Sequence, residues 1–306
     1  MRERHMRVLV LGSTGFLGGH TAEQLRALPG VRLLVGGRSP AAGVPLDLTA
    51  GPDVLADALR TAAPDVVVNC AGLVTGSAVR MTDVNARGPA ALCEAMGAAA
   101  PGARLVHLGS AAEYGPTAPG EAVAEDAPTR PQGPYGATKL AGTAAVRAAG
   151  LDAVVLRVFN PVGPGAPAAG LPGRLAGELR RARKSGTVRV GDLSAYRDFV
   201  DVRDVARAAV LAATAPGPLP DVLNIGSGRA TVVREIADGL VRAAGFAGRV
   251  EETSSGSARS SAVSWQCADI TAARAALGWE PGRVLADSLS DLWRAGPAGT
   301  PAPAAR

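Results

Sequence analysis

The sequence predicts an α/β fold, with a doubly wound parallel sheet and a smaller C-terminal lobe. Short apolar runs alternate with helical stretches through the first 160 residues, which is typical of a parallel sheet covered by helices. Proline and glycine become more frequent from about residue 161 to residue 173, which indicates a loop-rich second lobe. We therefore expect a Rossmann-type domain over 1–160 with a contribution from about 197–225, a smaller lobe over 161–196 and 226–295, and a disordered tail over 296–306.

Each expected strand is a run of four or five mostly apolar residues, which is the length of a buried strand rather than of a helix. The stretches between them are long enough for helices and mix polar with apolar residues. Strands are expected at 7–11, 31–35, 65–68, 104–108 and 153–156, and helices from the first glycine-rich turn to about residue 28 and at 53–63, 83–99 and 174–184.

Composition limits the classes of function to consider. Hydrophobic residues make up 47% and charged residues 19% of the 306 residues, as in a water-soluble globular enzyme. The net charge is +5, carried almost wholly by arginine, but no basic stripe with interleaved aromatic residues indicates nucleic-acid binding. No apolar run reaches the roughly 20 residues that cross a membrane, and the N-terminus lacks the regions of a signal peptide. The three cysteines have no metal-like spacing, so we expect a cytoplasmic protein without a metal site.

The first glycine-rich turn indicates a dinucleotide site. Gly12, Gly15 and Gly18 follow the 7–11 strand at once and lead into a helix. Glycines at such a turn let backbone N–H groups approach a pyrophosphate at the positive end of the helix. The spacing is GxxGxxG, and the strand before it and the helix after it favour dinucleotide binding over a simple tight turn.

The end of the second strand favours NADP over NAD. An NAD site usually has an acidic residue here, which binds the ribose hydroxyls. This chain has two glycines followed by Arg38 and Ser39, and a cation with a hydroxyl suits a 2′-phosphate. Asp47 and Leu48 follow the expected third strand.

The stretch from Pro134 to Lys139 carries the expected chemistry. Tyr135 and Lys139 are four residues apart, so on a helix their side chains reach the same region. A free tyrosine has a pKa of about 10, and a nearby ammonium lowers that pKa because it favours the phenolate. A tyrosine adjusted in this way can give a proton to a carbonyl oxygen or take one from an alcohol.

Several different short motifs are spread along nearly the whole chain, and together they form one set. The set is the glycine-rich turn, Asn69-Cys70-Ala71-Gly72, Ser110, the Tyr135 to Lys139 stretch, Arg157-Val158-Phe159-Asn160, the Arg197 to Val205 stretch, Asn224-Ile225-Gly226-Ser227-Gly228 and Leu277-Gly278-Trp279-Glu280-Pro281. Together these motifs resemble an extended short-chain dehydrogenase/reductase, of the NAD(P)-dependent nucleotide-sugar epimerase/dehydratase family. The Glu113-Tyr114 pair and the stretch from Val190 to Ala206 are more similar to GDP-4-keto-6-deoxymannose reductases than to 4-epimerases.

The resemblance implies a role for each matching residue. Tyr135 is implied as the acid–base residue, Lys139 as the residue that binds the nicotinamide ribose and lowers the tyrosine pKa, and Ser110 as the hydrogen-bonding partner of the reacting oxygen. The implied contacts to NADP, with NAD as the less favoured cofactor, are Gly12, Thr14, Gly15, Phe16, Leu17, Arg38, Ser39, Asp47, Leu48, Ala71, Gly72, Asn85, Tyr135 and Lys139. The implied substrate contacts are Ser110, Asn160, Arg197 and Arg259, with Asn160 and Arg197 at the nucleotide diphosphate.

Four departures from the family pattern narrow the function. Ala111 and Ala112 stand where sugar 4,6-dehydratases carry an acidic pair, so the groups that eliminate water are missing. The segment between Ala71 and Asn85 is shorter than usual, which removes potential substrate contacts. Arg259 lacks the Pro-x-Asp run that often follows it, and Thr143 replaces a glutamate that is common after the lysine.

These expectations favour an enzyme that uses NADPH to reduce the 4-keto group of a nucleotide-activated 4-keto-6-deoxyhexose. An epimerase that oxidises and re-reduces one carbon with bound NAD is an alternative, and Arg38 argues against it. A ketoreductase for a non-sugar natural product and a cofactor-binding protein without turnover also stay open; the intact Ser110, Tyr135 and Lys139 argue against the last. The expected partners are a nucleotide sugar and a second copy of the chain, because family members often dimerise through the helices after Asn85 and around Tyr135.

Overall fold

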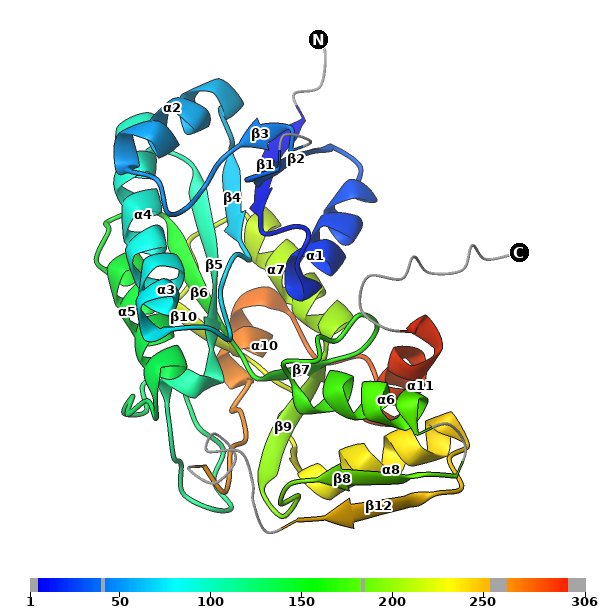
Figure 1. The fold of residues 1–306 in the computed structure, drawn as a ribbon. Coiled ribbons are helices and arrows are strands. Elements are labelled where there is room, and N and C mark those ends of the chain that lie inside the picture. The colour runs from blue at the N-terminus through cyan, green and yellow to red at the C-terminus, as the bar shows by residue number, and fades with distance from the viewer. Residues whose placement is uncertain (1–4, 40–41, 183–184, 254–262, 297–306) are drawn as a thin grey trace.

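The computed structural model describes residues 5–39, 42–182, 185–253 and 263–296. Within these residues one large sheet runs through the molecule, and its seven strands are all parallel (Figure 1). The strands lie in the order β3-β2-β1-β4-β5-β6-β10, so the chain changes direction across the sheet between β1 and β4. In chain order they are β1 (Met6–Leu11), β2 (Val31–Gly37), β3 (Val44–Pro45), β4 (Val66–Asn69), β5 (Arg104–Ser110), β6 (Ala153–Val158) and β10 (Val222–Ile225).

Helices cover both faces of this sheet because its central strands are apolar on both sides. Val8 and Val10 pack into one core with α1 and α7, whereas Leu9 and Leu11 pack into a second core with α2 and α4. Figure 1 shows α1 and α7 on one side of the sheet and α2, α4 and α5 on the other. The helices are α1 (Phe16–Arg26), α2 (Pro52–Ala62), α3 (Ala78–Thr82), the π-helix η1 (Asp83–Arg87), α4 (Gly88–Ala99), the 3₁₀-helix η2 (Ala111–Glu113), α5 (Pro134–Arg147) and α7 (Val202–Thr214).

Smaller sheets lie beyond the carboxyl ends of the large sheet's strands (Figure 1). The order β11-β9-β7 makes one, and the parallel pair β12-β8 makes another. A third apolar core, with Leu175, Leu179, Ile236 and Leu240, packs their helices against them. The elements are β7 (Asn160–Val162), α6 (Leu171–Arg181), β8 (Thr187–Val190), β9 (Tyr196–Asp201), β11 (Ala230–Val232), α8 (Val233–Ala244), β12 (Arg249–Glu252), α10 (Thr271–Leu277) and α11 (Leu285–Ala295).

Three aspartates in the Arg197 to Val205 stretch join these parts. Asp198 accepts hydrogen bonds from the Ser227 hydroxyl at 2.7 Å and from the Gly228 and Ala268 N–H groups at 2.9 and 3.1 Å. Asp201 accepts one from the Ser288 hydroxyl at 2.6 Å. Asp204 accepts two from the backbone N–H groups of residues 282 and 283, both at 3.0 Å. Much of this motif therefore holds the C-terminal segments in place.

The structure confirms the doubly wound parallel sheet and corrects several boundaries. The helix expected over 83–99 is interrupted, because α3 precedes it and a π-helix occupies Asp83–Arg87. A π-helix inserts one residue into a helical turn, and no apolar periodicity reveals it. The third strand has only two residues, Val44–Pro45. The basic helix expected to reach residue 184 ends at Arg181 in α6, and the expected tail lies almost wholly outside the described residues. None of the described helices is both long enough and apolar enough to span a bilayer.

Candidate active site

The glycine-rich turn is shaped for close backbone approach. Gly12 has φ +75°, and a Cβ there would lie 2.7 Å from Ala71 N and 2.8 Å from Ala71 Cα. A Cβ at Gly18 would overlap the Gly12 carbonyl oxygen. Both positions therefore require glycine, one for its backbone conformation and both for the space that a side chain would fill. The turn brings Gly12 against Ala71, so two of the expected cofactor-binding segments meet.

The N-terminus of α1 follows this turn and is open for an anion. Gly15 is the N-cap, and among the described residues no side chain caps the helix. The first N–H groups of a helix have no partner within it and attract negative charge. His20 Nε2 lies 3.0 Å from the Pro164 carbonyl oxygen, which places the loop after β7 beside the first turns of α1. Free N–H groups and small residues fit the pyrophosphate of a dinucleotide.

Arg38 and Asp47 meet at the far edge of the sheet, where β2 and β3 pair. Arg38 is exposed. The Asp47 carboxylate accepts hydrogen bonds from the backbone N–H and the hydroxyl of Thr49, both at 2.9 Å. The backbone bond from Thr49 is the largest cause that lowers the pKa of Asp47, and the charge of Arg38 adds to it. Leu48 is buried, so its side chain packs beneath this edge.

Asn85 is the buried amide of the π-helix. Its Oδ1 accepts a hydrogen bond from the Leu73 N–H at 2.8 Å, and its Nδ2 donates to the Leu73 carbonyl at 2.8 Å and to Thr138 Oγ1 at 3.2 Å. The side chain therefore fixes the segment after Ala71-Gly72 against α5. The expected contact of Asn85 with the cofactor stays a prediction, and the structure shows that Asn85 shapes the neighbouring backbone.

Ser110 ends β5 and begins the short helix η2. Its hydroxyl oxygen accepts a hydrogen bond from the Ala112 N–H at 3.2 Å. Its own N–H donates to Glu113 Oε1 at 2.8 Å, which completes a capping box. The Ser110 side chain is thus held at the carboxyl edge of the sheet, where ligands of doubly wound folds bind.

Tyr135 lies in the first turn of α5, and this turn rests on the residues after Ser110. A Cβ at Gly136 would overlap the Ala112 carbonyl oxygen and lie 3.0 Å from Pro131 Cβ. The close approach of α5 to η2 therefore depends on glycine beside Tyr135. Because Ser110 is the N-cap of η2, the two expected catalytic residues lie in neighbouring segments.

Lys139 is buried, with 4% of its surface exposed, and its Nζ donates a hydrogen bond to the Leu108 carbonyl of β5. Burial lowers the pKa of the Lys139 ammonium to about 8, and the negative charge of Glu113 opposes this effect. The lysine is thus fixed under the end of β5, one turn along α5 from Tyr135.

His107 belongs to the interior of the sheet. It is fully buried in β5, and its Nδ1 lies 3.2 Å from Asn69 Nδ2. Burial lowers the pKa of His107 well below its usual value, so the ring is neutral near pH 7. The structure therefore confirms that His107 is a core residue, as its apolar strand predicts.

The expected diphosphate residues are held by backbone groups. Arg197 donates hydrogen bonds to the Tyr196 carbonyl at 2.7 Å and to the Val263 carbonyl, and burial lowers its pKa. Asn160 donates to the Asp198 carbonyl at 2.8 Å. Both residues lie on paired strands, β9 and β7. Their contacts with a diphosphate stay predictions, and Arg259 lies outside the described residues.

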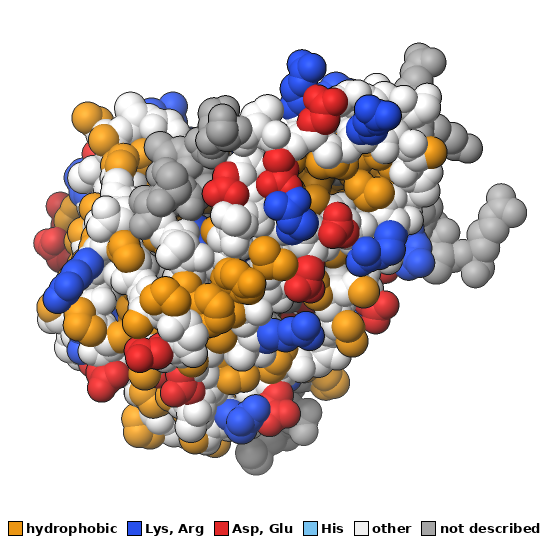
Figure 2. Space-filling view, turned by 90° about the horizontal axis from the view of Figure 1, so that it is seen from below, with side chains coloured by type: hydrophobic (Ala, Val, Ile, Leu, Met, Phe, Trp, Pro, Cys, Tyr) orange, Lys and Arg blue, Asp and Glu red, His pale blue; other side chains and the backbone are white. Residues whose placement is uncertain are grey.

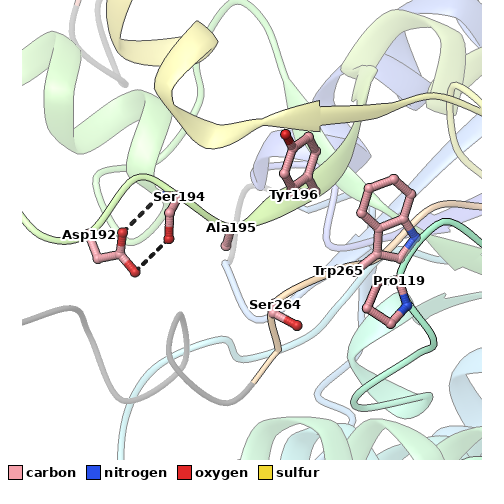
Figure 3. A pocket seen from close by; sticks show the side chains of 7 residues that line it. All are labelled: Pro119, Asp192, Ser194, Ala195, Tyr196, Ser264 and Trp265. Atoms are coloured by element: carbon pink, nitrogen blue, oxygen red, sulfur yellow. Dashed lines mark hydrogen bonds between the residues drawn. The ribbon is translucent and has the colours of Figure 1, made fainter.

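A cavity of about 460 Å³ lies at the start of β9, where Ala195 and Tyr196 line it (Figure 3). The rings of Tyr196 and Trp265 line it, with their centroids 5.0 Å apart (Figure 3). Asp192 and Ser194 also line it, and the Asp192 carboxylate accepts hydrogen bonds from the N–H and the hydroxyl of Ser194.

The face of the molecule that is seen from below carries hydrophobic side chains across its middle, with charged side chains around them (Figure 2). Sequence reasoning missed the aromatic pair, because 69 positions separate its members and no motif links them. Within the described parts of the chain, no cluster of His, Cys, Asp and Glu could hold a metal.

Comparisons with known proteins agree with this geometry. Residues 8–226 match the model of the NAD dependent epimerase/dehydratase family. The dTDP-6-deoxy-L-talose 4-dehydrogenase (NAD(P)(+)) of Kitasatospora kifunensis is 37% identical over 303 residues, which cover 94% of this chain and 95% of that protein.

Two solved structures have the same fold with different cofactors. One is the UDP-glucose 4-epimerase of Thermus thermophilus in complex with NAD, with a TM-score of 0.81 and 27% identity over 95% of this chain and 98% of that one. The other is RMD of Pseudomonas aeruginosa complexed with NADPH, with a TM-score of 0.80 and 25% identity over 94% of this chain and 97% of that one. The chain is an NAD(P)-dependent enzyme of the extended short-chain dehydrogenase/reductase type, and it belongs to the NAD dependent epimerase/dehydratase family.

Proposed function

We propose that this protein is an NADPH-dependent ketoreductase that reduces the 4-keto group of a nucleotide-activated 4-keto-6-deoxyhexose. One observation carries the proposal: Ser110, the first turn of α5 with Tyr135, and Lys139 converge at the end of β5. Ala111 and Ala112, which follow Ser110, supply no acid or base, so the site is equipped for proton transfer to a carbonyl and not for elimination of water.

Each of these residues has a separate task. The Ser110 hydroxyl donates a hydrogen bond to the carbonyl oxygen and orients it. The Tyr135 phenol gives its proton to the same oxygen as negative charge develops there. The Lys139 ammonium makes the phenol a stronger acid by favouring its phenolate. NADPH, when bound between the glycine-rich turn and these residues, supplies the hydride.

The choice of NADPH rests on Arg38 and Ser39. They follow β2 at the position from which a dinucleotide's adenine ribose is bound in this type of fold. A guanidinium binds a phosphate through charged hydrogen bonds, and the glycines before it offer no carboxylate for ribose hydroxyls. Of the two solved structures, one is a complex with NAD and the other a complex with NADPH. The choice of NADPH therefore rests on the residues of this chain.

The choice of substrate rests on the similarity to an enzyme named for oxidation at position 4 of a dTDP-linked 6-deoxyhexose. Reduction of the corresponding 4-keto sugar is the same reaction in the opposite direction. The test is to incubate the purified protein with NADPH and with GDP-linked or dTDP-linked 4-keto-6-deoxyhexoses. We expect NADPH oxidation equal to the amount of 6-deoxyhexose formed with at least one of them. Absence of NADPH oxidation with both would contradict the proposal.

An epimerase is the second candidate, and the epimerase structure of the same fold favours it. An epimerase returns the hydride to the carbon from which it came, so it consumes no cofactor overall. We expect no interconversion of UDP-glucose and UDP-galactose by this protein. Interconversion without added NADPH would make the epimerase the better proposal.

We also propose a homodimer through α4 and α5. Their outward positions carry small side chains, among them Ala90, Ala137 and Ala141, all exposed in the single chain. Small exposed residues let helices of two copies approach closely. Light scattering at micromolar concentration should give twice the mass of one chain, and Ala141→Glu should return the mass to that of one chain. A single-chain mass for the unaltered protein would contradict the homodimer.

A further inference from the structure

A buried carboxylate, Glu113, joins the catalytic serine to the catalytic helix. Glu113 has no exposed surface. Its Oε1 accepts hydrogen bonds from the Ser110 N–H at 2.8 Å and from the Thr143 hydroxyl of α5 at 3.0 Å. Its Oε2 accepts one from Arg157 Nε of β6 at 2.9 Å. Three elements of the sheet edge, the end of β5, α5 and β6, thus meet on one side chain.

The same carboxylate also acts on the Lys139 ammonium through its charge. Lys139 binds the carbonyl of Leu108, and Glu113 binds the N–H of Ser110, two residues along the same strand. In an extended strand, the carbonyl of one residue and the N–H of the second residue after it point to the same side. The space for the carboxylate depends on Gly109, where a Cβ would lie 2.8 Å from Glu113 Oε1. The ammonium and the carboxylate therefore occupy neighbouring positions under the strand end.

We propose that Glu113 is a positioning residue of the active site, which fixes the Ser110 backbone against α5 and acts as the counter-charge of the Lys139 ammonium. The proposal rests on the proposed function, in which Ser110, Tyr135 and Lys139 carry the chemistry. Glu113 forms a buried ion pair with Arg157 at 2.9 Å, and its negative charge also raises the pKa of Lys139 against the effect of burial.

The groups around Lys139 show why this charge matters. Burial lowers the pKa of Lys139 to about 8, and Glu113 is the first of the groups that oppose it. Burial raises the pKa of the Cys70 thiol to about 12 and lowers that of His107, so both are neutral near pH 7. Among the described side chains that influence Lys139, Glu113 is therefore the anion. The titratable and charged groups that act on the ammonium, directly or through Glu113, are Cys70 after β4, His107 of β5, Glu113 of η2 and Arg157 of β6.

Thr143 is the position on α5 from which a second carboxylate would reach the same space. It lies four residues, about one helical turn, after Lys139. The Thr143 hydroxyl donates to Glu113 Oε1 at 3.0 Å, so a longer acidic side chain at 143 would extend into the space that Glu113 occupies. Moving the carboxylate from η2 to α5 is therefore a direct experiment.

The chain has two lysines, Lys139 and Lys184, so the charge of Lys139 can be followed directly. Protein labelled with carbon-13 at the lysine Cε should give two NMR signals, and Lys184→Arg assigns them. In the unaltered protein we expect the Lys139 signal to titrate near pH 8. Glu113→Gln should lower this midpoint by about one pH unit or more, the usual effect of losing a close opposite charge. Thr143→Val removes the hydroxyl and no charge, so its midpoint should stay that of the unaltered protein.

The double variant Glu113→Ala/Thr143→Glu is the rescue. It returns a carboxylate from α5, and its Lys139 midpoint should lie near that of the unaltered protein. This variant also carries the test if Glu113→Gln does not fold: a midpoint near 8 supports the proposal, and a midpoint a unit or more lower overturns it. An unchanged midpoint in Glu113→Gln would likewise overturn the counter-charge.

The titration needs neither substrate nor turnover, so it separates this proposal from the proposed function. Failure of the proposed function appears as an unaltered protein that reduces no keto sugar, whatever the lysine titration shows. Where reduction is observed, the pH at which kcat changes should move with the Lys139 midpoint in Glu113→Gln and return in the double variant. If the pH at which kcat changes does not move with the Lys139 midpoint, the positioning role is contradicted. A loss of packing alone would lower kcat without shifting its pH dependence together with the Lys139 midpoint.

Discussion

The edge of the sheet that is proposed to carry the chemistry and the turn that leads into β9 hold their polar groups in opposite ways. At the catalytic edge, Glu113 and Asn85 are almost wholly buried, and both bind backbone groups of neighbouring segments. In the turn that leads into β9, beside the cavity, Asp192 and Ser194 are exposed, and Tyr196 at the start of the strand is 41% exposed. Buried polar groups with all their hydrogen bonds made fix one geometry. Exposed residues, in contrast, can be substituted without disturbing a core.

This difference suggests how one fold serves many substrates. Proton transfer requires the same atoms in the same places, so its residues lie where packing determines their positions. Recognition of a sugar and its nucleotide must differ between enzymes with different substrates, and the residues proposed for it, Asn160 and Arg197, lie on the short strands β7 and β9. Substitutions at the catalytic edge should therefore reduce kcat, and substitutions along β9 should raise KM.

The largest effect should come from Tyr135→Phe. This change keeps the ring and removes only the proton, so reduction should fall by roughly 10²- to 10⁴-fold, the usual contribution of a general acid. Fluorescence titration should show that NADPH binding is retained. The matched control is Tyr196→Phe, which alters an exposed tyrosine on β9 and should change kcat by less than about threefold. Equal turnover of Tyr135→Phe and the unaltered protein would remove Tyr135 from the mechanism.

A large loss of cofactor binding should follow Gly12→Ala. The new Cβ would have φ +75° and would lie 2.7 Å from Ala71 N, so the two segments of the cofactor site must separate. The control is Gly30→Ala, which has φ +76° and no described atom within 4 Å of its Cβ. We expect both variants to lose about 1 kcal/mol of stability from the backbone strain, and only Gly12→Ala to bind NADPH at least tenfold more weakly. Similar NADPH affinities would show that the turn does not hold the cofactor.

A smaller effect, confined to KM, should follow Arg197→Ala. Loss of a charged hydrogen bond to a diphosphate is worth about 1.5–3 kcal/mol, so KM for the nucleotide sugar should rise roughly tenfold or more while kcat stays nearly constant. Arg189→Ala is the control, because Arg189 is an exposed arginine of β8 whose partner is Glu251. A loss of kcat without a change of KM would place Arg197 with the catalytic edge instead.

The smallest effect should come from Arg38→Ala, which tests cofactor choice. Affinity for NADPH should fall about tenfold, since one charged contact to the 2′-phosphate is lost, and affinity for NADH should stay the same. Arg32→Ala, at an exposed position of β2, the strand that precedes Arg38, should change neither affinity. If the unaltered protein binds NADPH and NADH equally well, Arg38 does not select the cofactor.

The parts of the candidate site that are local in the chain can be predicted from the sequence. The glycine spacing of Gly12, Gly15 and Gly18 and the four-residue spacing of Tyr135 and Lys139 follow from the geometry of a turn and of a helix. The family resemblance, which the comparisons confirm, also depends on such short motifs.

The parts that sequence reasoning missed depend on contacts between distant segments. Glu113 pairs with Arg157 across 44 positions, and Trp265 meets Tyr196 across 69, so neither pairing appears as a local pattern. The π-helix that places Asn85 was also missed, because an inserted residue breaks the periodicity from which a helix is predicted. Arg197 could be named from a motif, but its backbone partners, Tyr196 and Val263, could not.

In the proposed reaction, hydride from NADPH ends at C4 of the sugar while Tyr135 supplies the proton. The most direct measurement uses NADPH deuterated at the transferred position, a nucleotide-linked 4-keto-6-deoxyhexose and mass spectrometry of the product. We predict one deuterium at C4 for each NADPH consumed, and formation of that product slowed roughly 10²- to 10⁴-fold in Tyr135→Phe. A reduced product without deuterium, or a sugar epimerised at C4 with no loss of NADPH, would contradict the claim.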